Sequence, residues 1–239
     1  MNPAIGIDRH HQNPKDEEKS KQMKIPLFPL GVVLLPGMPM PLHIFEERYK
    51  QMISQCIEGH APFGIVYFDG REICTKGCMA RVESVIKRYD DGRMDIMVRG
   101  GERFVILELM EEKPYVEARV SSFEDDPSHP KMDLSDTIQQ ANSLLDQFSD
   151  AAPIGVLGDE WKDLDVKTLS FAIASLSAFT HEEQQRFLEM RSSADRLTKS
   201  VKALSMIAER SRLTREIHRI IDGNGYPPKH MLEDMNPTK

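Results

Sequence analysis

Cysteine and histidine are the residues of this chain that could hold a metal ion. Cys74 and Cys78 lie four residues apart, and the other candidates are Cys56, His60 and His43. Structural zinc takes four ligands, which usually come as two closely spaced pairs, and the sequence offers no second close pair. We therefore expect free or partly buried thiols and no cofactor, while metal binding by Cys74 and Cys78 stays open.

Catalytic side chains are the next possibility. His43 stands alone among apolar residues, where a histidine is usually structural rather than a general base. The paired carboxylates at Asp90-Asp91 and Glu124-Asp125-Asp126 lie in turn-like segments. Acid–base catalysis needs carboxylates held in a cleft with shifted pKa values, so we interpret these as solvated. No G-x-x-x-x-G-K-[ST] phosphate-binding loop occurs, and the sequence predicts a non-enzymatic protein.

Two sets of arginines could bind a partner. Arg103 follows Gly100-Gly101, and we weigh a binding role against a bulge that leaves the arginine on the sheet surface. The last predicted helix carries seven basic residues: Arg196, Lys199, Lys202, Arg210, Arg212, Arg215 and Arg219. Acidic residues interleave with them, which favours an ordinary solvated helix face.

Composition narrows the class of protein. The chain has 239 residues and a formal charge of −7, and this acidic balance makes a general nucleic-acid binder unlikely, since such proteins usually have a basic face. No apolar run approaches the ~20 residues that span a bilayer, and residues 1–22 lack the apolar core of a secretory signal. The three cysteines suggest no disulfide framework. We expect a cytoplasmic protein without a membrane segment.

Hydrophobic periodicity predicts short strands first. In the proline-rich segment Lys24–Tyr49, prolines separate two short strands, Ile25–Leu30 and Val32–Leu35, around bends. Pro36-Gly37 is a turn signal, and Met40–Phe45 is expected to be extended. Further strands are expected at the following ranges: Phe63–Phe68, Cys78–Tyr89, Met94–Val98, Arg103–Met110 and Tyr115–Phe123. Asp69–Gly77 is expected to be a polar loop, and Asp90-Asp91-Gly92 a hairpin turn.

Helical periodicity appears in two places. Glu46–Glu58 places apolar residues on one face and ends at Gly59, which we expect to cap it. After the acidic, proline-containing segment Glu124–Pro130, the apolar residues recur at helical spacing. Thr180 and Glu183 have capping-box spacing, and Ser192-Ser193 offers the cap of a long final helix.

The predicted fold class is therefore α+β, with a β-rich pseudo-barrel lobe containing one early helix, followed by an α-helical bundle lobe. The expected organisation is a disordered leader at 1–22, the β-rich lobe at 23–126, the helical lobe at 127–222, and a flexible tail at 223–239.

A family resemblance rests on the segment Lys24–Tyr49, KIPLFPLGVVLLPGMPMPLHIFEERY. It resembles the opening of the Lon protease N-terminal (substrate-recognition) domain. Further matches follow in the same order, at Phe63–Val66, Asp91–Arg93, Ile96–Val98, Gly101–Phe104, Lys113–Tyr115 and Ala118, and Leu169–Leu197 resembles the helical half. The resemblance covers roughly residues 24–213. It implies a PUA-like β lobe and a stand-alone recognition module without the ATPase and protease modules of Lon.

The function that this resemblance implies is binding of unfolded polypeptide or a partner protein in protein quality control. The alternative is a PUA-like RNA-binding protein, and the oligomeric state is left open. The candidate binding residues are Met38 and Met40, whose thioethers suit adaptable apolar surfaces, with Glu47 and Arg48 beside them on the first helical turn. The competing interpretation of Met38 and Met40 is core packing beneath that helix.

Overall fold

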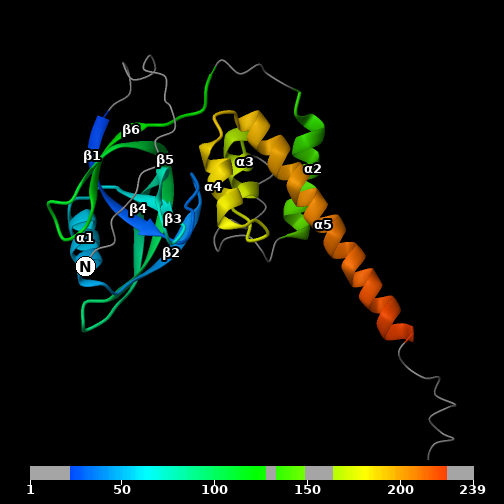
Figure 1. Cartoon of the computed structure of the whole chain (residues 1–239), viewed down its shortest axis with the longest axis horizontal. Helices are drawn as coiled ribbons and strands as arrows, with labels where there is room; N and C mark the ends of the chain where they lie inside the picture. The colour runs from blue at the N-terminus through cyan, green and yellow to red at the C-terminus, as the bar shows by residue number, and fades with distance from the viewer. Residues whose placement is uncertain (1–21, 128–132, 149–163, 225–239) are drawn as a thin grey trace, which may run out of the picture. The chain divides into compact units, whose positions relative to one another are not determined.

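The computed structural model describes residues 22–127, 133–148 and 164–224 (Figure 1). Six strands and one helix come first, and four helices follow, which confirms the α+β class. The predicted leader and the predicted tail lie outside the described residues, apart from Gln22, Gly223 and Asn224.

The strands are β1 (Gln22–Leu30), β2 (Pro39–Ile44), β3 (Phe63–Phe68), β4 (Ile73–Arg88), β5 (Met94–Met110) and β6 (Glu117–Ser122). They form one sheet in the order β2-β5-β4-β3-β1-β6, and an additional β5–β6 pairing closes it. Only the β1–β3 pair is parallel among these six strands. Closure removes all edges except that of β2, which flanks the barrel, and the pseudo-barrel expectation is confirmed.

The inside of the barrel is an apolar core. Its buried members come from five strands and are Ile25, Leu27, Val66, Ile73, Met79, Phe104, Ala118 and Val120. β1 and β6 each contribute two alternate residues, because side chains of a strand point to opposite faces in turn.

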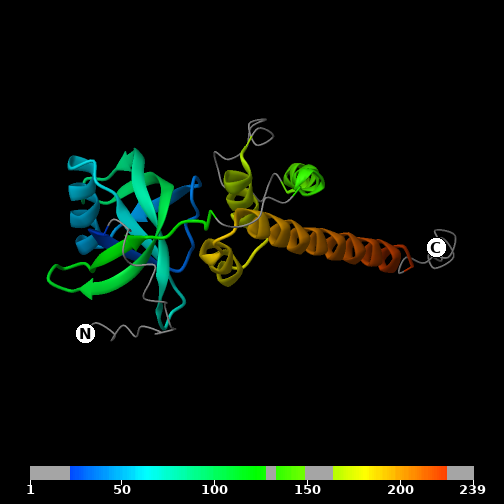
Figure 2. The same cartoon turned by 90° about the horizontal axis from the view of Figure 1, so that it is seen from above.

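Helix α1 (Glu47–Glu58) lies against the outside of the barrel in both views (Figures 1 and 2). Its buried residues, Tyr49, Met52, Ile53 and Cys56, recur at helical spacing as predicted. Gly59 occupies the C-cap in a right-handed conformation, and the positive φ of 49° falls on His60 instead.

Several strand boundaries differ from expectation. Val32–Leu35 is not a strand: Val33, Leu34 and Leu35 are buried in irregular backbone that leads into the turn. β4 begins at Ile73 rather than Cys78, because residues of the expected polar loop pair with β3 and β5. β5 runs unbroken through Gly100-Gly101. The Asp90-Asp91-Gly92 turn is confirmed, with Gly92 at a φ of 81°.

The later helices are α2 (Ser135–Gln147), α3 (Val166–Ala174), α4 (His181–Glu189) and α5 (Ser193–Asn224). The Thr180–Glu183 capping box is present at the start of α4, and Ser192 Oγ accepts from the Asp195 N–H at the start of α5, as predicted. Asp165 caps α3.

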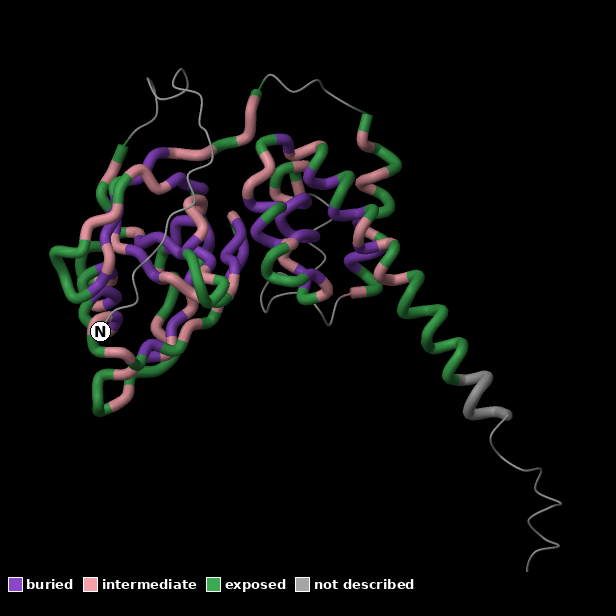
Figure 3. Tube along the Cα trace, in the orientation of Figure 1, coloured by how far each residue is buried: buried purple, intermediate pink, exposed green. Residues whose placement is uncertain are grey.

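The chain divides into two compact units, residues Met1–Val201 and Lys202–Lys239. Within the first unit we call residues 22–122 the β lobe, and α2, α3, α4 and α5 up to Val201 the helical lobe. The predicted boundary at residues 126 and 127 stays a prediction. In the second unit the described part of α5 is mostly exposed (Figure 3).

Candidate functional site

The predicted binding residues lie on a continuous turn, strand and helix. Leu35, Pro36, Gly37 and Met38 form a tight turn in which the Met38 N–H donates to the Leu35 carbonyl at 3.1 Å. Gly37 takes the φ of 78° that such a Pro-Gly turn requires. Strand β2 follows immediately, and α1 begins three residues after β2 ends.

The two methionines of this stretch differ in exposure. Met38 is only 5% exposed and belongs to the core of the β lobe, which agrees with the packing interpretation and leaves its side chain unavailable at the surface. Met40 is half-buried on β2, opposite Val98 of β5. Of the pair, Met40 alone can offer its thioether to a partner in this conformation.

Glu47 and Arg48 lie on the first turn of α1, as predicted. The Glu47 side chain is 88% exposed and pairs with Lys50 at 3.0 Å. Arg48 pairs with Glu46 at 2.8 Å, and its guanidinium lies 4.6 Å from the centre of the Tyr49 ring. Both charges therefore stay at the surface, and local contacts hold Arg48 in place.

Phe45 is an exposed aromatic residue that the sequence did not single out. It is 60% exposed and lies between β2 and α1. Phe45 precedes α1 and is not part of its periodic apolar face. This was the one feature of the sequence that could have indicated its exposure. We call Phe45, Glu47 and Arg48, which follow one another closely in the chain, the α1 surface.

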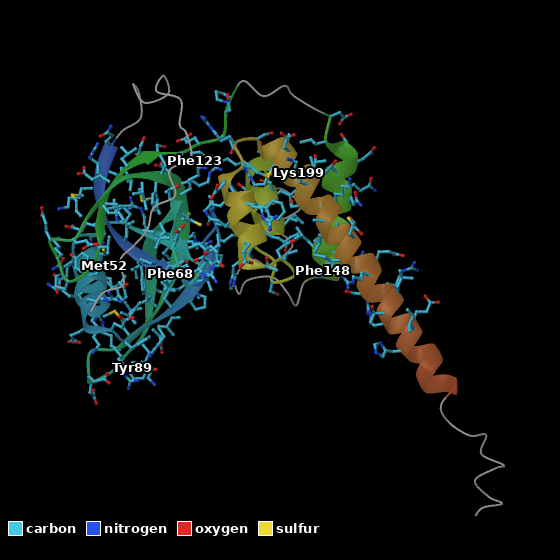
Figure 4. All side chains as sticks on the ribbon, viewed as in Figure 1. Met52, Phe68, Tyr89, Phe123, Phe148 and Lys199 are labelled. Carbon is cyan, nitrogen blue, oxygen red and sulfur yellow. The ribbon has the colours of Figure 1, made fainter. Side chains whose placement is uncertain are left out.

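A polar network supports Phe45 from the side of the sheet. The His43 ring stacks on Phe45 with centroids 5.9 Å apart, and His43 Nδ1 lies 2.5 Å from Asp95 Oδ1. The Tyr89 hydroxyl donates to Asp95 Oδ2 at 2.8 Å, from a position near the tip of the β4–β5 hairpin (Figure 4). Hydrogen bonds from His43 and Tyr89 hold the pKa of the Asp95 carboxyl below its ordinary value. His43 thus contacts both Phe45 and Asp95, and its structural role stays a prediction.

The thiols show no sign of activation. Burial raises the pKa of Cys78 to about 12, and that of Cys56 and Cys74 to about 11. Within residues 22–127, 133–148 and 164–224 no three His, Cys, Asp or Glu side chains gather in a way that could hold a metal ion. A thiolate is the form that binds metal or attacks an electrophile, and burial disfavours this form at all three cysteines.

Three charged residues lie in environments that the sequence did not predict. Arg103 is 3% exposed, although we expected it either on the sheet surface or in a binding role. Arg196 is fully buried, although we expected it on a solvated helix face. Both donate to the carboxylate of Asp125, which is not the solvated acid predicted for that segment. The resulting cluster joins β5, the segment after β6, and α5.

The fold is a closed, mostly antiparallel sheet with a helical extension. The family model for the ATP-dependent protease La (LON) substrate-binding domain matches residues 24–206, and the chain belongs to this family.

Similar proteins agree with this assignment. The Lon protease of Cytophaga hutchinsonii is 22% identical over 91% of this chain, and that of Amoebophilus asiaticus is 26% identical over 77%. These alignments cover 28% and 24% of the two relatives, so the chain spans about a quarter of their length.

Two solved structures share the fold. A Lon N-terminal domain protein from Xanthomonas campestris matches 74% of this chain and 96% of its own length, with a TM-score of 0.59 at 22% identity. The N-terminal domain of Mycobacterium avium complex Lon protease matches 77% of this chain and 98% of its own, with a TM-score of 0.58 at 18% identity. In the part of our chain that the structure describes, no helix is long and apolar enough to cross a membrane.

Proposed function

We propose that this protein binds unfolded polypeptide, or a partner protein that presents an extended apolar segment, without catalysing a reaction on it. The observation that carries the proposal is the exposed Phe45 beside the charges of Glu47 and Arg48, in a chain of the LON substrate-binding family. Apolar contact supplies most of the affinity of such surfaces, and flanking charges set register and specificity.

The geometry suits this role because the α1 surface is fixed before a partner arrives. The turn before β2 is closed by its own hydrogen bond, and β2 pairs with β5 along six residues. His43 holds one face of the Phe45 ring. An aromatic side chain that is already ordered loses little conformational entropy on binding, which favours affinity.

The test is a binding titration with a permanently unfolded probe. Fluorescently labelled α-lactalbumin with its disulfides reduced and carboxymethylated is titrated with the wild-type protein, and native α-lactalbumin is the folded control. We expect binding of the unfolded probe alone. Phe45→Ala should weaken it at least severalfold, since truncating an aromatic anchor removes much of the interaction energy.

Ile86 provides the matched control. It is 59% exposed, so it equals Phe45 in exposed apolar character, and it lies on β4, which β5 separates from β2 in the sheet. Ile86→Ala should bind like the wild type. Equal binding by Phe45→Ala and wild type would remove the α1 surface from the proposal. Binding of single-stranded RNA with a steep salt dependence would instead favour the nucleic-acid alternative.

A further inference from the structure

Several polar contacts join the two lobes of the first unit. The Tyr67 hydroxyl of β3 donates to Glu182 of α4 at 2.9 Å, and Lys76 of β4 pairs with Glu189 at 3.2 Å. The Gln185 side chain donates to the Lys76 carbonyl at 3.1 Å. Polar contacts of this kind between two parts of a chain usually allow relative motion. A fixed arrangement of the lobes needs an additional constraint.

Asp125 supplies such a constraint from the segment that connects the lobes. Its Oδ1 accepts from Nη2 of Arg103, which projects from β5 in the β lobe. Nη1 of Arg196, from α5 in the helical lobe, donates to the same oxygen at 3.1 Å, and its Nη2 donates to Oδ2 at 2.8 Å. One carboxylate therefore binds a cation from each lobe.

The helical lobe contributes further acceptors to the two arginines. Arg103 Nη1 donates to the carbonyls of Leu188 and Met190 at 2.7 and 2.6 Å, and Arg196 Nη1 donates to Met190 at 3.0 Å. These carbonyls lie at the C-terminus of α4, which carries the negative end of the helix dipole. The side chains of Arg103 and Arg196 are 2% and 0% exposed, and that of Asp125 is 17% exposed.

Aromatic rings enclose the two guanidinium groups. The Arg196 guanidinium lies 3.8 Å from the centre of the Phe171 ring, and that of Arg103 lies 4.9 Å from the Phe123 ring. Burial lowers the pKa of Arg103, and the charge of Arg196 lowers it further while Asp125 raises it. Two buried cations thus share one partly buried anion, and the cluster depends on the charge of Asp125.

We propose that Asp125 is a latch that holds the two lobes in one arrangement, and that removing its negative charge lets the lobes separate while each stays folded. Without the carboxylate, two buried guanidinium charges would face each other uncompensated, which is strongly unfavourable. Separation would return both to water.

Small-angle scattering and calorimetry of the Asp125→Asn variant test the latch. We expect a larger radius of gyration than the wild type, an unchanged far-UV circular dichroism spectrum, and two thermal transitions in place of one. Glu117→Gln is the matched control. Its carboxylate is 7% exposed and binds Lys24 at 2.9 Å and Lys113 at 3.0 Å, all within the β lobe. This control should melt earlier, but in one transition and with the wild-type radius.

Two more variants make every outcome decisive. Asp125→Glu retains the charge and should keep the wild-type radius of gyration. Arg103→Gln removes the cation of the β lobe and with it the bonds to Asp125, Leu188 and Met190, so it should also open the protein. It decides the question alone if Asp125→Asn does not fold. A wild-type radius and a single transition in both Asp125→Asn and Arg103→Gln, or in Arg103→Gln alone where Asp125→Asn does not fold, would overturn the proposal. So would equal opening of Asp125→Glu and Asp125→Asn.

Discussion

The main chain of Gly100 lies directly against the carbonyl of Leu35, so that a Cβ atom added to Gly100 would overlap the Leu35 oxygen. Two hydrogen bonds of 2.9 Å enforce this approach, from the Gly37 N–H to the Gly100 carbonyl and from the Gly100 N–H to the Met38 carbonyl. Strand β5 therefore holds the Pro-Gly turn that leads into the α1 surface.

Gly100→Ala should lower the free energy of unfolding by about 3 kcal/mol, the upper end of the usual overpacking cost, because neither backbone can move away freely. Gly101→Ala is the control. An added Cβ there would meet its nearest neighbour, Met79 Cβ, at 3.5 Å, an ordinary contact. Its stability should be unchanged or higher by about 0.5 kcal/mol, as alanine loses less entropy than glycine on folding. Urea unfolding measures both, and equal stability of the two variants would contradict the expectation.

Tyr49→Ala should destabilise the protein by about 3 kcal/mol, as truncation of buried aromatic residues does. Tyr49 is 7% exposed on the inner face of α1, and its ring centre lies 4.1 Å from that of Phe28 on β1. Tyr49→Phe keeps the ring and should stay within about 1 kcal/mol of the wild type, as near-isosteric swaps do. Chemical denaturation followed by circular dichroism is the measurement. A Tyr49→Ala variant as stable as Tyr49→Phe would mean that this packing contributes little.

The sequence predicted the local elements well where one physical signal dominated. Pro36-Gly37 and Gly92 require backbone conformations that few other residues allow, and both turns were predicted correctly. The inner face of α1 followed from helical periodicity. β4 was predicted too short and β5 as two strands, because glycines at Gly77 and Gly100 read as breaks although here they allow close contacts inside continuous strands.

The sequence could not predict residues whose environment comes from distant parts of the chain. Arg103, Asp125 and Arg196 are separated by 22 and 71 residues, and each alone resembles a solvated surface charge. Their burial results from the meeting of β5 and α5, which local pattern does not encode. Phe45 was missed because a single exposed aromatic residue has no periodic signature in the sequence.

The rate at which each cysteine is labelled should depend on the burial and the pKa of its thiol. Cys78 is fully buried and has its pKa raised to about 12, so at pH 7 it is protonated and shielded. Cys74 is half-buried with a pKa of about 11. Because the thiolate is the reactive form, labelling by a maleimide should be slow at both, with Cys74 modified before Cys78. Mass spectrometry of timed samples gives the order. In urea above the unfolding midpoint both should react rapidly, and equally fast labelling of both without urea would argue against the packing of β4.

The last prediction concerns the charges of the α1 surface. Glu47 and Arg48 make exposed or half-exposed ion pairs with Lys50 and Glu46. Such pairs contribute about 0–1 kcal/mol each, and the contact of Arg48 with the Tyr49 ring adds about 0.5–1 kcal/mol at an exposed site. The double variant Glu47→Ala, Arg48→Ala should therefore fold and melt within a few degrees of the wild type.

The same double variant should bind the unfolded probe more weakly, because the charges beside Phe45 would no longer orient the segment. Glu108 and Arg119 give the matched control: they form an exposed ion pair of 2.9 Å between β5 and β6. Replacing both by alanine removes the same number and signs of charge, so the net charge is equal in the two variants. We expect the Glu108, Arg119 variant to bind like the wild type. If both double variants melt and bind like the wild type, the partner does not use the charges of the α1 surface, and the basic residues of α5 that remain exposed, such as Lys199, become the next to test.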